Sequence, residues 1–208
     1  MKNFKAMGAA QARKQSGFTI IELVVVILLL GILTATALPR FLDISTEAHN
    51  AVVDAVEGSL RTGGALYRAN WYAENQPTGV VGGTDWGSTF PNTTSGYPAA
   101  PAGGVDDNTI DLSTECQALF VNLLQGGAPT IDDAVALFTT TTPADTDDYT
   151  VTDTDLADAG STAFDFVATN TSDDNCTFTY IADSTRLTVA TAPNLTYNAT
   201  TGVWTRTN

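Results

Sequence analysis

The longest apolar stretch of the chain runs from Phe18 to Leu38 and contains a single charged residue, Glu22. A helix rises by about 1.5 Å per residue, so a helix over this stretch is about 31 Å long. That length is close to the roughly 30 Å hydrocarbon core of a membrane. The pattern therefore predicts a helix over 18–38 that can span a bilayer.

Beyond this stretch, apolar or small residues recur at intervals of mostly three or four positions as far as Trp71. They are Phe41, Ile44, Ala48, Val52, Ala55, Val56, Leu60, Gly64, Tyr67 and Trp71. This period is that of an amphipathic helix, so one long helix is predicted to continue from the apolar stretch, with its stripe covered by another element. Gly31 and Pro39 disfavour helix, because glycine costs about 1 kcal/mol relative to alanine and proline removes a backbone donor. A kink or a break is expected there.

The middle of the chain carries turn and helix signals. Residues 75–109 are rich in Gly, Pro, Asn and Thr, which indicates a long loop with room for one short strand. A capping-box pattern at Thr114–Gln117 precedes an apolar run, and Gly126 and Gly127 follow it, which predicts a short helix. A second helix is predicted after Thr130, with Ile131, Ala134, Val135 and Phe138 on its apolar side.

The last third of the chain carries strand signals, because apolar residues alternate there with polar ones between turn residues. The alternating positions are Phe164, Phe166, Cys176, Phe178, Tyr180, Leu187, Val189 and Val203. An antiparallel sheet can pack its apolar face on the helix stripe. The predicted fold class is therefore α+β, with a long N-terminal helix packed on a C-terminal antiparallel sheet.

The charges are distributed unevenly along the 208 residues, a length that suits one domain with an appendage. Four of the nine basic residues, Lys2, Lys5, Arg13 and Lys14, precede residue 18, leaving five arginines against 23 acids, a balance of −18. Nucleic-acid binding is disfavoured, because it depends on basic residues that neutralise phosphates. The positive-inside rule places the N-terminus in the cytoplasm and the rest of the chain outside.

Glu22 needs a physical account, because an ionisable group inside a membrane segment is costly and indicates a function. Alternatively, Glu22 has no functional role, and its side chain extends to the membrane–water interface near the helix end. An ordinary secretory signal with cleavage at Ala35-Thr36-Ala37 is another alternative. The apolar stretch is longer than such signals usually are, and they do not carry a carboxylate at the fifth apolar position.

The basic leader, the segment Ser16-Gly17-Phe18-Thr19-Ile20-Ile21-Glu22-Leu23 and the unbroken apolar run resemble the class III signal of type IV pilins and the related pseudopilins. The resemblance implies that a prepilin peptidase cuts between Gly17 and Phe18 and methylates the new amino group of Phe18. It divides the chain into a cleaved leader at 1–17, a transmembrane and polymerisation helix at 18–38, and an exported head domain at 39–208.

The resemblance also implies roles for residues within the helix. The carboxylate of Glu22 would serve assembly by pairing with the Phe18 amine of a neighbouring subunit, so that each charge offsets the desolvation of the other. The segment between Gly31 and Pro39 would lose helical structure in the filament. Residues 37–42, Ala-Leu-Pro-Arg-Phe-Leu, resemble pilins of the mannose-sensitive haemagglutinin type, although the leader of seventeen residues is longer than usual.

The function implied by the resemblance is that of a structural subunit of a type IV pilus, a surface filament for adhesion or motility. The implied partners are other copies in a helical homopolymer, the peptidase, and the assembly machinery of an ATPase, an inner-membrane platform and a secretin. The precursor would lie in the inner membrane and the mature protein in an extracellular pilus. A type II secretion pseudopilin and a low-abundance minor pilin are the alternatives.

An enzyme anchored by the apolar helix is the most different class, and no catalytic constellation supports it. The single histidine, His49, has acids around it but no candidate nucleophile, so a surface position is expected for it. No cofactor is predicted.

The two cysteines, Cys116 and Cys176, are free thiols or ligands in a reducing compartment and can form a disulfide in an oxidising one. The predicted export places them outside the cytoplasm. Pilins commonly carry one C-terminal disulfide, so the resemblance implies a bond between these two residues.

Two weaker patterns concern ligands and modification. The densest acidic cluster comprises Asp145, Asp147, Asp148, Asp153, Asp155 and Asp158. Calcium favours such ligands, but the glycine and terminal glutamate of an EF-hand loop are absent, so a solvated loop and no metal site are predicted. Five asparagines fit the Asn-x-Ser/Thr pattern of glycosylation sites: Asn92, Asn170, Asn175, Asn194 and Asn198. Because the chain is rich in threonine, such matches also arise by chance.

Overall fold

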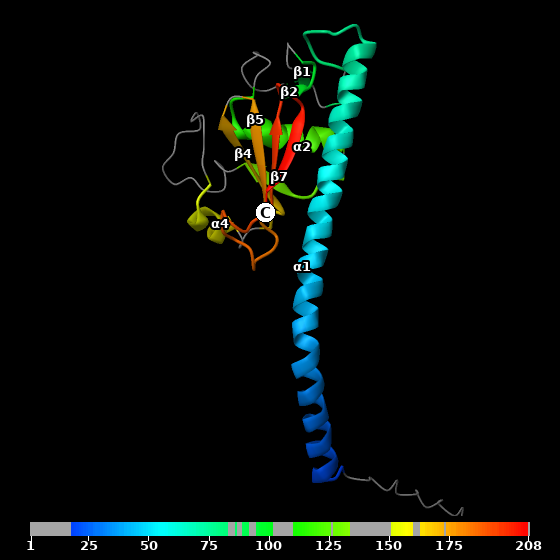
Figure 1. Cartoon of the computed structure of the whole chain (residues 1–208), viewed down its shortest axis with the longest axis vertical. Coiled ribbons are helices and arrows are strands. Elements are labelled where there is room, and N and C mark those ends of the chain that lie inside the picture. Colours follow the sequence, from blue (N-terminus) through cyan, green and yellow to red (C-terminus); the bar gives the residue numbers. More distant parts are fainter. Residues whose placement is uncertain are drawn as a thin grey trace, which may run out of the picture. The chain divides into compact units, whose positions relative to one another are not determined.

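The computed structural model describes the chain over residues 18–82, 86, 89–91, 95–101, 110–125, 127–133, 151–159, 163–172 and 174–207. The chain divides into two compact units, residues 1–45 and residues 46–208. Its elements are α1 (Ile20–Ala73), β1 (Thr89–Pro91), β2 (Pro98–Pro101), α2 (Ser113–Leu124), β3 (Ile131–Asp133), α4 (Asp153–Ala159), β4 (Phe166–Ser172), β5 (Asn175–Tyr180), β6 (Asn194–Asn198) and β7 (Val203–Thr207) (Figure 1). The predicted α+β fold class is confirmed.

Helix α1 is 54 residues long and contributes to both units. The predicted continuous helix from the apolar stretch to Trp71 is therefore confirmed. In the single chain, α1 runs through Gly31 and Pro39 without interruption. Loss of helical structure between these residues concerns packed subunits, and it stays a prediction.

Within the first unit, the segment Ile20–Ala37 has a mean hydropathy of 2.7, and none of it is buried. By length and composition it can cross a membrane. Its threonine hydroxyls are satisfied inside the helix, since Thr34 donates to the carbonyl of Leu30 at 2.9 Å and Thr36 to that of Leu33 at 3.0 Å. Because these hydroxyls need no outside partner, they do not oppose an apolar environment.

Within the second unit, one side of α1 packs into the core that it shares with the sheet and α2. The large buried side chains on this side of α1 are Val53, Val56, Leu60, Tyr67 and Trp71. All but Val53 were expected in the stripe. Val52, which the period places in the stripe, is 42% exposed, because the side of the helix that faces the sheet passes through Val53 instead.

Helices α1 and α2 approach each other closely at Gly63. A Cβ atom added to this residue would lie 2.6 Å from the carbonyl oxygen of Leu123 in α2. Only glycine fits such a distance without a shift of one backbone, so Gly63 sets how near the two helices can lie.

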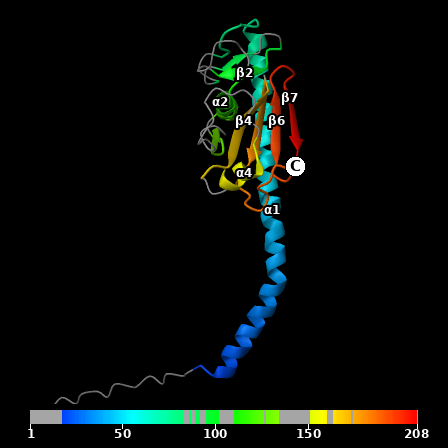
Figure 2. The ribbon, with the colours of Figure 1, turned by 90° about the vertical axis from the view of Figure 1, so that its left-hand side faces the viewer.

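The sheet has the order β3-β4-β5-β6-β7, antiparallel throughout except for the parallel pair β3-β4. One face carries Phe166 and Phe178, whose ring centroids lie 5.3 and 5.1 Å from that of Phe120 in α2. The other face carries Val167, which packs with Leu156 of α4 in a smaller cluster. Figure 2 shows α4 beside β4 and β7 at the opposite side of the sheet.

Two local predictions in the second half of the chain are wrong. The helix expected after Thr130 is strand β3 at 131–133, because Ile131 pairs with Phe166 of β4; residues 134–138 lie outside the described residues. The strand expected at Leu187 and Val189 is an irregular connection, in which the N–H of Thr191 donates to the carbonyl of Thr188 at 3.0 Å.

Strands β6 and β7 also differ from the strands that the alternating pattern predicts. Strand β6 lies at Asn194–Asn198, where the alternation of mostly polar residues did not stand out. In β7, Val203 is 52% exposed and Trp204 is buried. The bulk of tryptophan decides which face of β7 turns inward, because the larger apolar side chain gains more from burial.

The predicted short helix is α2, which starts at Ser113 instead of after Thr114. Glu115 performs the capping, because its carboxylate accepts the backbone N–H groups of Asp111 at 3.0 Å and Leu112 at 3.2 Å. The amide of Gln117 instead donates to the carbonyl of Ile131 in β3 at 3.1 Å. At the other end, Gln125 adopts the left-handed conformation with φ 46°, and Gly126 lies outside the described residues.

Glu115 is a buried acid, with 3% of its surface exposed. Burial raises its pKa from 4.5 to about 7, and the nearby Asp111 carboxyl adds to the rise, while the two capping N–H groups act against it. Oxygen atoms of both carboxyl groups, Oδ1 of Asp111 and Oε1 of Glu115, are buried without a hydrogen-bond partner among the described residues. A second negative charge at this helix start is therefore unfavourable.

A raised pKa makes the stability of the head depend on pH. The bound proton stabilises the folded state fully below the unfolded pKa near 4.5, and this contribution is lost as the pH rises through 7. We expect the free energy of unfolding to fall by roughly 2 kcal/mol between about pH 5 and pH 8. Urea titrations of the full chain at both pH values measure this. Glu115→Gln should flatten the dependence, and an equally steep slope in that variant would contradict the assignment.

Cys116 of α2 and Cys176 of β5 are joined by a disulfide, and neither residue is exposed. The bond connects residues 60 positions apart and fixes α2 to the centre of the sheet. The disulfide that the resemblance implied is therefore present in the fold.

The segment after α1 contains two paired strands, β1 and β2, where room for one was predicted. Its apolar residues Val81 and Trp86 are buried in the main core. The ring of Trp86 meets Tyr67 of α1 edge to face at 5.7 Å, and Tyr67 donates its hydroxyl to the carbonyl of Thr89 at 2.7 Å. The loop therefore closes one end of the core.

Candidate processing and assembly site

The first described residues of the chain lead directly into α1. Phe18 is 79% exposed and Thr19 follows it, before the helix begins at Ile20. Gly17, the other residue of the predicted cleavage site, lies outside the described residues. The exposure of Phe18 suits a residue on which a processing enzyme acts.

Glu22 and Thr19 form a reciprocal cap at the start of α1. The carboxylate oxygen Oε2 of Glu22 accepts the backbone N–H of Thr19 at 2.9 Å and its hydroxyl at 2.7 Å. In return, the hydroxyl oxygen of Thr19 accepts the N–H of Glu22 at 3.3 Å. The two side chains together therefore satisfy two backbone N–H groups, those of Thr19 and Glu22, that would otherwise lack partners at the helix start.

This cap was not recognised in the sequence, although its signal is there. Thr19 followed by a glutamate three residues later is the capping-box pattern. Capping is a role of Glu22 in addition to the charge pairing that the sequence predicts for it. The cap uses only one of the two carboxylate oxygens in the described chain.

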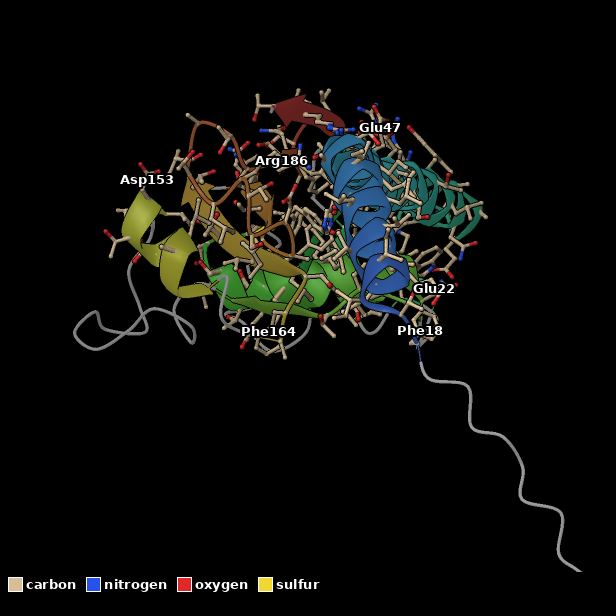
Figure 3. All side chains as sticks on the ribbon, turned by 90° about the horizontal axis from the view of Figure 1, so that it is seen from below. Phe18, Glu22, Glu47, Asp153, Phe164 and Arg186 are labelled. Carbon is tan, nitrogen blue, oxygen red and sulfur yellow. A yellow bond between two sulfur atoms is a disulfide. The ribbon has the colours of Figure 1, made fainter. Side chains whose placement is uncertain are left out.

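The carboxylate lies beside an apolar surface. Glu22 and Phe18 border an open depression of about 300 Å³ whose other lining residues are Ile21, Val25 and Val26. Figure 3 shows Phe18 and Glu22 together at the start of α1. A negative charge at the edge of such a surface favours a partner that brings a cation together with apolar area.

The remainder of the apolar segment is exposed around its whole circumference. Examples are Ile20 at 84%, Leu28 at 61% and Leu33 at 62%. An apolar helix with no buried side requires lipid or other helices around it, because water solvates such an area poorly. The arrangement can therefore insert into a membrane and self-associate.

His49, the single histidine, serves the structure of the second unit. His49 is half-buried, and its Nδ1 lies 2.7 Å from the hydroxyl of Tyr180 in β5. It connects α1 to the sheet, and the surface position expected for it is only partly correct.

The acidic cluster is described only in part. Asp155 caps α4 by accepting the N–H of Thr152 at 2.8 Å, and Asp153 accepts the N–H of Val189 at 2.6 Å. Asp145, Asp147 and Asp148 lie outside the described residues, as does the side chain of Asp158. Within the described ranges, no group of three His, Cys, Asp or Glu residues is arranged to hold a metal ion.

The glycosylation patterns differ in accessibility. Asn170 is 2% exposed, and its amide donates to the carbonyl of Ile110 at 3.1 Å. The folded head therefore does not present it to an enzyme. Asn175, Asn194 and Asn198 are half-buried at strand ends, and Asn92 lies outside the described residues.

Comparisons with known proteins agree with this geometry. Residues 12–38 match the family model described as the prokaryotic N-terminal methylation motif. The chain is 32% identical over 114 residues to the type IV narrow pilus major component PilA5 of Thermus thermophilus, a match of 55% of this chain and 90% of that protein.

Two further relatives match a shorter part. The chain is 39% identical over 74 residues to a fimbrial protein of Neisseria meningitidis, spanning 34% of this chain and 44% of the relative. It is 35% identical over 94 residues to the type IV major fimbrial protein FimA of Dichelobacter nodosus, spanning 44% and 58%. No solved structure matches the chain.

Proposed function

Because this chain belongs to the type IV pilin family, we propose that it is the repeating structural subunit of an extracellular pilus that serves adhesion or motility. Membership of the family implies self-polymerisation into pili. In our proposal the leader 1–17 is removed by prepilin peptidase, the segment 18–38 spans the membrane and then forms the polymer, and 39–208 is the exported head.

The observation that carries this proposal is the start of α1. An exposed Phe18 precedes a helix whose apolar segment Ile20–Ala37 has no buried side, and Glu22 is held at the beginning of that helix. A cut between Gly17 and Phe18 leaves the apolar helix in the mature protein. The helix can then exchange lipid neighbours for helices of other copies.

Assembly is driven by the exchange of lipid for helices of other copies, together with one charge pair between the Phe18 amine and Glu22. The new amino group of Phe18 carries a positive charge, methylated or not, and it needs a counter-ion in apolar surroundings. We propose that Glu22 of a neighbouring subunit supplies it through the carboxylate oxygen that the Thr19 cap does not use. The segment between Gly31 and Pro39 loses helical structure as the subunits pack.

The proposed location follows from the charges. The basic leader keeps the N-terminus of the precursor in the cytoplasm and the head outside the inner membrane. The partners are the peptidase and the pilus assembly machinery of an ATPase, a membrane platform and a secretin. The disulfide between Cys116 and Cys176 suits the oxidising side of the membrane.

N-terminal sequencing and the intact mass of protein sheared from the producing cells test the proposal. We expect abundant sheared protein that begins with methylated Phe18. An N-terminus at Leu38 would identify an ordinary secreted protein and refute the roles of Glu22 and the apolar segment. Correctly processed protein that is present only in trace amounts on surface filaments would identify a minor pilin, and short periplasmic assemblies would identify a pseudopilin.

A further inference from the structure

The exported part of the chain carries a large negative net charge, which opposes contact between copies. Five arginines face 23 acids beyond residue 18, so heads repel one another over a distance set by the salt concentration. A stable contact between heads must place arginines of one copy against acids of the next. The positions of the arginines therefore limit where such a contact can form.

An open depression of about 360 Å³ lies along the seam between α1 and β7. Arg61 and Gly64 of α1 line one side, and Trp204 of β7 lines the other. The side chain of Arg61 is 51% exposed. The indole Nε1 of Trp204 lies 3.8 Å from where a Cβ on Gly64 would be, and it donates no hydrogen bond within the described chain. The depression thus offers hydrogen-bond donors.

Arg68 lies one helical turn beyond Gly64, and its guanidinium stacks on the ring of Tyr97, which also lines the depression. Its hydrogen bonds go to neutral oxygens only, namely the hydroxyl of Tyr97 at 2.7 Å, the hydroxyl of Tyr72 and the carbonyl of Ser95, both at 3.3 Å. No carboxylate in the described chain compensates its charge.

Among the arginines whose side chains the structure describes, the other three differ from Arg68 in this respect, because each is paired with an acid. These pairs are Arg61 with Glu57, Arg186 with Asp183, and Arg206 with Asp54. A cation without an acid partner among the described residues can bind an acid of another molecule.

Acids that can serve as partners are present at the far side of the sheet. Helix α4 carries Asp153 and Asp155 and packs beside β4, whereas the depression lies at β7, the last strand on the opposite side (Figure 2). A contact between α4 of one copy and the depression of the next joins two different surfaces. Such a contact does not close into a dimer, and it builds an open polymer where the rotation between copies does not close into a ring.

We propose that the depression at the α1–β7 seam binds carboxylates from the α4 surface of a second copy of this chain, with Arg68, which stacks on the lining residue Tyr97, as the cation. The inference rests on the proposed function, because it assigns a side-by-side contact between heads in the same filament. It explains how heads that repel one another overall can lie in contact.

A charge exchange tests the proposal. Arg68→Glu should lower the yield of sheared filaments by about tenfold or more, because a like charge replaces an attraction, while unassembled protein remains in the membrane. Adding Asp153→Arg to that chain should restore most of the yield. The matched control is Arg68→Glu with Glu47→Arg, which has the same net charge as Arg68→Glu with Asp153→Arg. Glu47 is an exposed residue of α1, away from α4 (Figure 3). The substitution Glu47→Arg should therefore not restore the filament yield.

If Asp153→Arg and Glu47→Arg restore the filament yield equally, the effect depends on net charge alone and the proposal is overturned. Filament yield unchanged by Arg68→Glu would also overturn it, and loss of binding to an acidic polysaccharide in that variant would assign the depression to such a ligand instead. Failure of the proposed function would differ from all of these outcomes, since the unsubstituted chain would then yield no sheared filaments.

Cysteine pairs provide a test that does not depend on charge. Ala65 beside the depression and Thr154 on α4 are both exposed. Filaments of the chain with Ala65→Cys and Thr154→Cys should give a ladder of covalent multimers on a non-reducing gel, and each single variant should give monomers. Intact filaments of the double variant without a ladder, or dimers from Ala65→Cys alone, would contradict the proposed contact.

Discussion

Replacing Glu22 by glutamine is expected to abolish filament assembly while the start of α1 stays capped. Glutamine can accept the Thr19 hydrogen bonds as glutamate does in a capping box, but it cannot neutralise the Phe18 amine of a neighbour. A buried charge without its partner costs about 3 to 5 kcal/mol. Since about 1.4 kcal/mol is a factor of ten, the yield of sheared filaments should fall roughly a hundredfold or more.

Two variants separate the charge of Glu22 from its capping role. Glu22→Ala should be inserted and processed at Phe18 but assembled as poorly as Glu22→Gln. Thr19→Ala removes the hydroxyl of the cap and keeps the charge, so it should assemble close to normally. If Glu22→Gln assembles normally and Glu22→Ala and Thr19→Ala do not, the helix cap matters and the charge pair does not.

Loss of the disulfide is expected to have the largest effect on the stability of the head. Cys116 and Cys176 close a loop with a sequence separation of 60, for which chain entropy gives a stabilisation of about 4 kcal/mol. That is a large part of the 5 to 15 kcal/mol by which folded domains are usually stable. The chain with Cys116→Ser and Cys176→Ser should unfold at a much lower urea concentration.

Urea unfolding of the full chain in detergent, followed by tryptophan fluorescence, measures this effect. All three tryptophans, Trp71, Trp86 and Trp204, are buried in the main core, so the signal reports the head. The unsubstituted chain with a reducing agent is the matched control and should approach the double variant. A shift of less than about 1 kcal/mol in both would show that packing around α2 holds the head without the bond.

The local features of the molecule were predictable from the sequence. The apolar segment, the continuous helix α1 and the short helix α2 follow from composition and from a period of three to four residues, which neighbouring residues alone determine. The candidate site at Phe18 and Glu22 was predictable for the same reason, because its residues lie within one helical turn. The cap by Thr19 was also readable and was missed.

The pairing of distant segments was not predictable. A parallel strand at Ile131 and a strand at β6 depend on partners far along the chain, and local signals favoured helix and loop there. In β7, a shift of one residue decides whether Val203 or Trp204 faces the core, since side chains alternate with a period of two. Burial, which raises the pKa of Glu115, depends on the same packing.

The sequence by itself thus determined the apolar segment and the continuous helix α1 that contains it, because these depend on residues that are neighbours in the chain. Only the tertiary structure decided that the two cysteines meet and that Arg68 has no carboxylate partner in the described chain. Both depend on which segments far apart in sequence lie side by side, and hydrophobic patterns specify how much surface is buried but not against which partner.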